Sequence, residues 1–289
     1  MAWTQKIIEA HITLTADSFG GKGVQKIIRG LPVAVQIKKT GGAEKPSCAL
    51  SVAGMTYSDM EQLTTLAFRP LQTRKNLLAV FAGDQESGLS RVFAGEIVTA
   101  SADFNAAPDP VFDIEALTAY YPALMATGPL AIKGDAPAAD IIKQQAALVG
   151  YQFENQGVTS RLRNCILNGD PIAKAKAAAK QAGATLLLED AKMTLLPAGV
   201  AKKGKAVKVS ATSGLIGYPT FTADGIEFEA LFDPAFELDG LVQVQSIVPK
   251  ASGVWRITAL NHHLSANMPD GGPWKTKISA VYVDAEVKS

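Results

Sequence analysis

Two of the chain's three histidines are neighbours in the stretch Val254–Ala280, which reads VWRITALNHHLSANMPDGGPWKTKISA. His262, His263 and the nearby Asp270 carry the imidazole and carboxylate groups that hold zinc or move protons. The surrounding pattern predicts a strand that leads into a Pro-Asp-Gly-Gly turn. Adjacent strand residues point to opposite faces, so the two rings should diverge and should not chelate one ion. We therefore interpret both histidines as structural or surface residues.

The remaining residues offer little that could form a catalytic site. His11 lies within a predicted strand, and no phosphate-binding glycine loop, HExxH, GxSxG or SxxK motif is present. Cys48 and Cys165 are far apart and form no CxxC motif, so we expect two free thiols. We expect no catalytic residues, no cofactor and no metal, although the lack of a motif does not exclude an unrelated soluble enzyme.

Length and composition place the chain among ordinary globular proteins. Its 289 residues, 47% of them hydrophobic, allow one to three domains. The net charge of +1 gives no whole-chain argument for nucleic-acid binding. The N-terminus does not resemble a signal peptide, and no apolar run approaches the roughly 18 residues of a membrane span. We expect that the protein does not insert into a membrane and that it is synthesised in a cytoplasm.

Three segments with different patterns follow one another along the chain. Residues 1–124 and 206–289 contain short alternating strands bounded by turn residues, which predicts antiparallel sheets or barrels. In the first segment only Ser58–Ala67 resembles a helix, with Ser58 as N-cap and Glu61 completing a capping box. Residues 125–205 change to alternating helices and strands. The sequence therefore predicts a mainly β protein with an α/β insert.

The insert repeats one helix pattern twice. Each predicted helix has an aspartate N-cap, an early proline and a terminal glycine: Asp135, Pro137 and Gly150, then Asp170, Pro171 and Gly183. Strand-like sequence follows each helix. The insert holds 11 basic and 6 acidic residues, most simply explained as lysines solvating an alanine-rich helix. The Lys202–Lys205 run reads as an exposed linker.

The two β segments also resemble each other in sequence. The matched positions are Phe68 and Pro70 with Phe232 and Pro234, Val98–Ala100 with Ile257–Ala259, and Pro108 and Phe112 with Pro269 and Trp274. This internal sequence similarity indicates a duplication, in which two similar antiparallel β-barrels flank the insert.

The stretch Gly214–Gly240, GLIGYPTFTADGIEFEALFDPAFELDG, resembles the baseplate hub proteins of contractile-tailed bacteriophages, the tail hub or late control protein D-like family. The resemblance extends through the next strand pair to Ala280. It rests on a structural turn motif made of Gly217, Pro219, Gly225, Phe232, Pro234, Gly240, Gly271 and Trp274. Asp233 stands where the family often has asparagine, and either side chain caps a turn.

The resemblance implies a homotrimeric hub in the virion tail baseplate, made in the bacterial host cytoplasm. Two tail-tube-like barrels per chain would give a ring of six, which joins a sixfold tail tube or tube-initiator protein to a threefold central spike. Each barrel would offer an edge strand to its neighbour. The tape measure protein and DNA would pass through the lumen, and the basic insert would lie outside the ring.

A second hypothesis is a tail-associated peptidoglycan-binding module or cell-wall hydrolase. Residues 135–157 resemble part of a peptidoglycan-binding helix–strand unit. That module, however, needs strand, helix, helix and strand within about 45–50 residues. The sequence before Asp135 matches a strand pattern only weakly.

Overall fold

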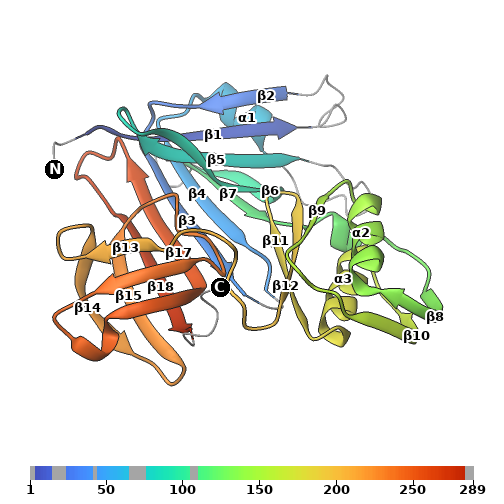
Figure 1. The fold of residues 1–289 in the computed structure, drawn as a ribbon. Helices are drawn as coiled ribbons and strands as arrows, with labels where there is room; N and C mark the ends of the chain where they lie inside the picture. The colour runs from blue at the N-terminus through green and yellow to red at the C-terminus, as the bar shows by residue number, and fades with distance from the viewer. Residues whose placement is uncertain (1–3, 15–23, 42–43, 65–75, 105–109, 284–289) are drawn as a thin grey trace.

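The computed structural model describes residues 4–14, 24–41, 44–64, 76–104 and 110–283 (Figure 1). The first part contains β1 (Lys6–Leu14), β2 (Val24–Ile28), β3 (Val33–Thr40), β4 (Ser47–Ala53), α1 (Tyr57–Leu63), β5 (Leu77–Asp84), β6 (Gly88–Asp103) and β7 (Val111–Leu117). The middle contains η2 (Pro122–Leu124), β8 (Leu130–Pro137), α2 (Ala138–Leu148), β9 (Gln152–Asn155), β10 (Arg161–Leu167), α3 (Pro171–Gln181), β11 (Ala184–Glu189) and β12 (Lys192–Pro197). The last part contains β13 (Val207–Ser210), β14 (Leu215–Phe221), β15 (Gly225–Leu231), β16 (Leu241–Gln245), η3 (Pro249–Ala251), β17 (Gly253–Ala266) and β18 (Trp274–Tyr282).

The first and last parts share one continuous sheet, so the prediction of two separate closed barrels is wrong. The strand order is β14-β15-β18-β17-β3-β4-β7-β6-β5-β1-β2, with β16 on β17 and β13 on β16. The cause is the length of β17, which has 14 residues. One of its edges pairs with β16 near Gly253–Arg256 and then with β3 along Ala259–Ala266. Figure 1 shows β17 and β3 side by side where the two halves meet.

Each half of this sheet nevertheless packs on a hydrophobic cluster of its own. In β1 every second residue from Ile8 to Leu14 is buried, as the alternating sequence predicts. Phe93 and Phe112 lie in the first cluster, whereas Phe228 and Trp255 lie in the last. The insert encloses a third cluster. The division at residues 124 and 205 remains a prediction, with which the three clusters are consistent.

The two halves repeat one strand arrangement. The order β3-β4-β7-β6-β5 in the first half corresponds to β14-β15-β18-β17-β16 in the last. A β-bulge falls at the same place in both: after Ile97 in the β6–β7 ladder and after Ile257 in the β17–β18 ladder. The halves differ beyond this set, because β1 pairs antiparallel with β5 whereas β13 pairs parallel with β16.

Backbone hydrogen bonds align the two copies residue by residue. The amide of Ile97 donates to the carbonyl of Asn76 at 2.8 Å, and that of Ile257 donates to Gly240 at 2.9 Å. Across the ladders, Ile97 lies opposite Ala116 and Ile257 lies opposite Ala280. Ile97 and Ile257 therefore occupy equivalent positions.

This alignment corrects the one predicted from sequence. Val98, matched to Ile257 above, lies one residue beyond the equivalent position, and a slip of one residue moves a side chain to the other face. Phe112 corresponds to Thr276 and not to Trp274, because Phe112 lies opposite Ala102 where Thr276 lies opposite His262. The matches that involve Phe68, Pro70 and Pro108 lie outside the described residues.

The insert contains two strand–helix–strand units, β8-α2-β9 and β10-α3-β11. β8 pairs antiparallel with β10, while β11, β12 and β9 form a second small sheet (Figure 1). A strand therefore does precede the first helix, contrary to the sequence reading. One helix between strands in each unit is not the strand–helix–helix–strand order of the peptidoglycan-binding hypothesis. No helix in the described ranges is long and apolar enough to cross a membrane.

The helix caps were predicted with mixed success. Asp170 caps α3, since its Oδ1 accepts from the amides of Ile172 at 2.8 Å and Ala173 at 3.0 Å. Gly150 and Gly183 follow the two helices with positive φ, as expected of terminal glycines. The Asp135 cap is wrong, because that residue lies within β8.

The short helix of the first part also begins earlier than predicted. α1 covers Tyr57–Leu63, and its N-cap is Thr56, whose hydroxyl accepts from the amide of Asp59 at 3.2 Å. Ser58 therefore lies inside the first turn and is not the cap.

Candidate functional site

The two neighbouring histidines diverge, as the strand pattern predicts. His262 is buried, with Nδ1 2.8 Å from the hydroxyl oxygen of Thr276, whereas His263 on the next position of β17 is partly exposed. Burial, with smaller contributions from Lys39 and His263, lowers the pKa of His262 to about 3. The ring is therefore neutral at pH 7. Within the described ranges, no group of three or more histidine, cysteine, aspartate or glutamate residues could hold a metal ion.

An aromatic cluster lies beside His262 and includes two residues of the turn motif. The ring of Phe232 lies edge-on to His262 and to Trp274, with centroids 5.4 Å apart in each case. The Lys6 ammonium lies 5.6 Å from the centroid of the Trp274 ring. Phe232 and Trp274 also pack against the core of the first half. The cluster therefore joins the last β part to the first.

The other motif residues lie at a bulge within β14, at a strand start and in turns, and no hydrogen bond among them is found in the described ranges. Gly217 has φ 67°, Pro219 is buried in β14, Gly225 begins β15, Pro234 is exposed, Gly240 accepts the bond from Ile257, and Gly271 has φ 76°. Asp233 accepts from the amide of Ala235 at 2.8 Å, a turn-capping contact.

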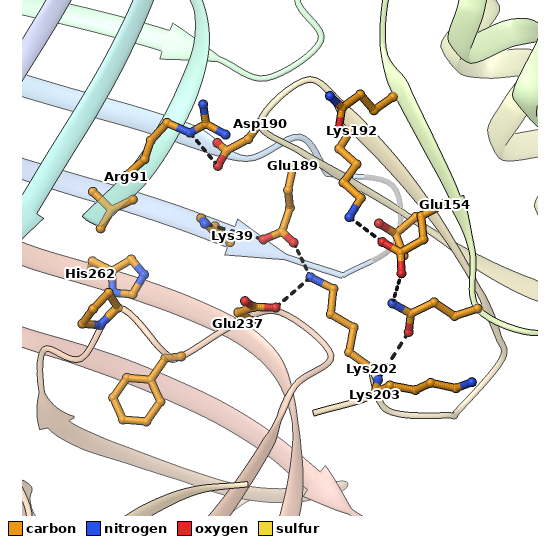
Figure 2. Close-up of a pocket in the computed structure, with 16 residues that line it drawn as sticks. Lys39, Arg91, Glu154, Glu189, Asp190, Lys192, Lys202, Lys203, Glu237 and His262 are labelled. Atoms are coloured by element: carbon orange, nitrogen blue, oxygen red, sulfur yellow. Dashed lines mark hydrogen bonds and ion pairs between the residues drawn. The ribbon is translucent and has the colours of Figure 1, made fainter. Parts of the chain in front are cut away.

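A polar cleft of about 400 Å³ lies where the insert meets both β halves (Figure 2). Lys39 of β3 and Arg91 of β6 reach it from the first half. Glu189 at the end of β11 and Lys202 beyond β12 come from the insert, and Glu237 precedes β16. Figure 2 shows Lys39, Glu189, Lys202 and Glu237 directed toward one another. Arg91 is directed toward Asp190 in the same view.

Glu189 lies at the centre of an ion-pair network that connects the three parts. Its carboxylate is 3.5 Å from the Lys39 ammonium and 2.7 Å from that of Lys202, which is also 3.2 Å from Glu237. Burial would raise the pKa of Glu189, but the two lysines outweigh it and hold that pKa below its usual range. Burial likewise opposes the charge on Lys202, yet Glu189 and Glu237 raise its pKa. Both groups are therefore ionised at neutral pH.

The prediction that residues 202–205 form an exposed linker is wrong for Lys202, whereas residues 203–205 are exposed. The Lys202 side chain is 15% exposed, and its amide donates to the carbonyl of Asp239 at 2.7 Å. Beside it, Arg91 pairs with Asp190 at 3.2 Å and Lys192 pairs with Glu154. These charges neutralise one another in pairs. Glu189 and Asp190 of the insert bind Lys39 and Arg91 of the first half, and Lys202 binds Glu237 of the last part. We therefore call this cleft a joint, meaning a set of ion pairs that connects the parts of the chain.

Removing the central carboxylate should weaken this joint. Glu189→Gln would leave the mostly buried Lys39 without its counter-ion and would leave Lys202 with only the more exposed Glu237, and the expected loss is about 2 kcal/mol of unfolding free energy. Urea denaturation measures it as a lower midpoint. Glu154→Gln is the matched control, since its pair with Lys192 is about 40% exposed and should contribute little. Equal midpoints for the two variants would contradict the joint.

The sequence gives no signal for this network. Lys39, Glu189, Lys202 and Glu237 come from separate segments of the chain, and each looks like an ordinary solvent-exposed charged residue in the sequence. A second joint was missed for the same reason. The buried carboxylate of Glu96 accepts from the amide of Tyr120 at 3.0 Å and from the Tyr151 hydroxyl of the insert at 3.3 Å.

Sequence comparison finds one family model, described as Baseplate hub gp41, which matches residues 8–269. No curated protein matches the sequence.

Solved structures with similar folds come from tail proteins and from a secretion system. The 43 kDa tail protein of prophage MuSo2 from Shewanella oneidensis gives a TM-score of 0.62 at 11% identity, covering 96% of this chain and 97% of that one. A tail protein from Neisseria meningitidis gives 0.62 at 10% identity, covering 94% and 96%. The E. coli c3393 protein, a component of the type VI secretion system, gives 0.60 at 6% identity, covering 88% and 74%. These likenesses show the fold.

Proposed function

We propose, since the chain belongs to the baseplate hub gp41 family, that it is the structural hub of a contractile phage tail. Three copies would form a ring that joins the sixfold tail tube, or its initiator protein, to the threefold central spike. The tape measure protein and the DNA would pass through the ring. The function is mechanical and involves no bond chemistry.

One observation supports this role above the others, the repeated strand arrangement of the two halves. The order β3-β4-β7-β6-β5 recurs as β14-β15-β18-β17-β16, with the bulge in the same place. Three such chains present six similar sheets around one axis. A threefold assembly thereby offers near-sixfold contacts on one side and threefold contacts on the other.

The contacts between the three parts of the chain would suit a protein that transmits mechanical force within the tail. Ion pairs of Glu189 and the aromatic cluster of Phe232 fix the three parts of each chain against one another. The insert branches from the first half beyond β7 and lies to one side of the large sheet (Figure 1). We place this basic insert on the outside of the ring, away from the passing DNA.

The mass of the assembly tests the proposal. The full-length chain, alone and co-expressed with the spike protein of the same tail, is measured by light scattering and native mass spectrometry. We expect a species of three chains, three times 30.4 kDa, in at least the co-expressed sample. A strictly monomeric chain in both samples, or a twofold dimer, would contradict the ring.

A further inference from the structure

The insert is layered, and the two-stranded ribbon of β8 and β10 is its outermost layer. α2 contacts β8 and β9, and α3 contacts β10 and β11, so the helices touch both small sheets of the insert. In Figure 1 the ribbon lies on the side of the insert that faces away from the large sheet. The ribbon is therefore accessible to a neighbouring molecule.

The two small sheets of the insert differ in how they are covered. β11 and β12 contain the consecutive buried residues Leu186–Leu188 and Met193–Leu196, a pattern typical of a sheet that is covered on both faces. Leu187 and Leu196 pack on Leu238 of the last part. The ribbon packs on the core of the insert through one face, which carries Leu130, Ile132, Leu162 and Leu167. Its other face is exposed.

The exposed face of the ribbon has an apolar centre. We call it the ribbon face, formed by Ala131, Lys133, Asp135, Arg161, Arg163 and Ile166. Ile166 is 64% exposed and lies opposite Ala131 in the ladder, which is exposed as well. A single exposed apolar residue is ordinary on a protein surface, so the charges on the same face decide how it is interpreted.

Those charges leave the ribbon face with an excess of two positive charges. Arg161 pairs with Asp135 at 2.6 Å. Arg163 lies opposite Asp135 in the ladder, but the carboxylate contacts Arg161. Within the described ranges, neither Lys133 nor Arg163 forms an ion pair. The ribbon face therefore combines an exposed isoleucine with two cations that lack a counter-ion.

The edges of the ribbon are poorly suited to the addition of a third strand. The ladder is interrupted between Arg163 and Cys165 by a bulge, where Asn164 has φ 46° and Gly134 has φ 78°. The side-chain oxygen of Asn164 accepts from the amide of Gly134 at 2.8 Å and holds this bulge in place. Bulges and charged side chains discourage pairing at strand edges. A partner would therefore contact the face of the ribbon and not its edge.

We propose that the ribbon face binds an acidic surface on a neighbouring protein of the tail. In this contact an apolar side chain of the partner packs against Ile166, and carboxylates of the partner pair with Lys133 and Arg163. The inference rests on the proposed hub function, in which the insert lies on the outside of the ring, and it gives the insert a binding role of its own.

The composition of the ribbon face favours a protein over a membrane or a nucleic acid. Anionic membrane surfaces are bound by clusters of about 4–8 basic residues, and nucleic acids are bound through many phosphate contacts. Two excess charges are too few for either. An apolar centre together with arginine is typical of protein interfaces, where opposite charges around the centre orient the two surfaces.

Photo-crosslinking in assembled tails tests the ribbon face. The full-length chain, with benzoylphenylalanine in place of Ile166, is supplied to cells that produce the other proteins of the same tail. The tails are purified and irradiated, and the crosslinked peptides are identified by mass spectrometry. We expect a crosslink to a peptide of another tail protein, with aspartate or glutamate beside the crosslinked residue.

Charge reversal shows whether the acidic residues hold the partner. Lys133→Glu combined with Arg163→Glu should lower the crosslink yield about tenfold, because like charges then face each other across the interface. Lys143→Glu combined with Lys180→Glu is the matched control, since it changes the net charge equally at exposed positions of α2 and α3. Replacing the carboxylates of the crosslinked peptide by lysine should restore the yield of the first variant.

Three results would overturn the inference in different ways. Tails that contain the chain but give no crosslink, or give equal yields after the two charge reversals, overturn the acidic partner and leave the hub function intact. A crosslink to a second copy of this chain, to lipid or to DNA has the same consequence. Tails that lack the chain overturn the hub function and the inference together.

Discussion

Gly225→Ala should unfold the last β part of the chain. Gly225 begins β15, and a Cβ atom at this position would lie 2.1 Å from the carbonyl oxygen of Ala280. The obstacle is the backbone of the neighbouring strand β18 at the end of the β15–β18 ladder, which no rotamer change can move. We expect a loss of more than about 4 kcal/mol, the range of exceptional point substitutions. Urea denaturation and the soluble yield measure it.

Gly204→Ala provides the matched control for this substitution. Nothing lies within 4 Å of the Cβ position at Gly204, and its φ is outside the left-handed region. The denaturation midpoint of this variant should equal that of the parent protein. If Gly225→Ala denatured at the same urea concentration as Gly204→Ala, the close contact with Ala280 would be disproved.

Acidification should destabilise the protein through His262. Burial lowers the pKa of this ring to about 3, below the ordinary value of 6.5 that applies when the chain is unfolded. Between these values the unfolded chain binds a proton that the folded chain excludes. The contribution of the neutral His262 ring to the free energy of unfolding is therefore complete above pH 6.5 and is lost as the pH falls toward 3. Each pH unit costs about 1.4 kcal/mol, on the order of 5 kcal/mol over the window.

Denaturation midpoints at several pH values measure this contribution. In His262→Gln the slope between pH 4 and 6 should be clearly shallower than in the parent protein, even if the variant is less stable overall. His263→Gln should keep most of the parent's slope, because His263 is partly exposed, although burial lowers the pKa of this ring as well. Parallel slopes for the parent and His262→Gln would exclude the buried ring as the source.

Local features of the fold could be predicted from the sequence where neighbouring residues decide them. The alternation in β1, the cap at Asp170 and the divergence of His262 and His263 depend only on strand period and capping chemistry. Asp135 shows the limit of such rules. Although it has the side chain of a cap, it pairs with Arg161 of β10 at 2.6 Å, so tertiary contacts keep it in a strand.

Long-range pairing could not be predicted in the same way. Whether a strand closes its own barrel or continues into another sheet depends on which edges meet in space. The ladder that joins Ala266 to Val33 connects residues from opposite ends of the chain, and nothing near either residue encodes the choice. The Glu189 network follows from that pairing, because it forms only after the three parts are brought together.

The β17–β3 ladder also determines how the protein can move. Rotating the first part against the last would break a run of eight paired residues, from Ala259 to Ala266, so no hinge exists at this seam. A pull along the strands loads these perpendicular hydrogen bonds together and does not open them one at a time. Each polypeptide is consequently stiff across this seam, and in the proposed ring any bending would fall on the contacts between chains.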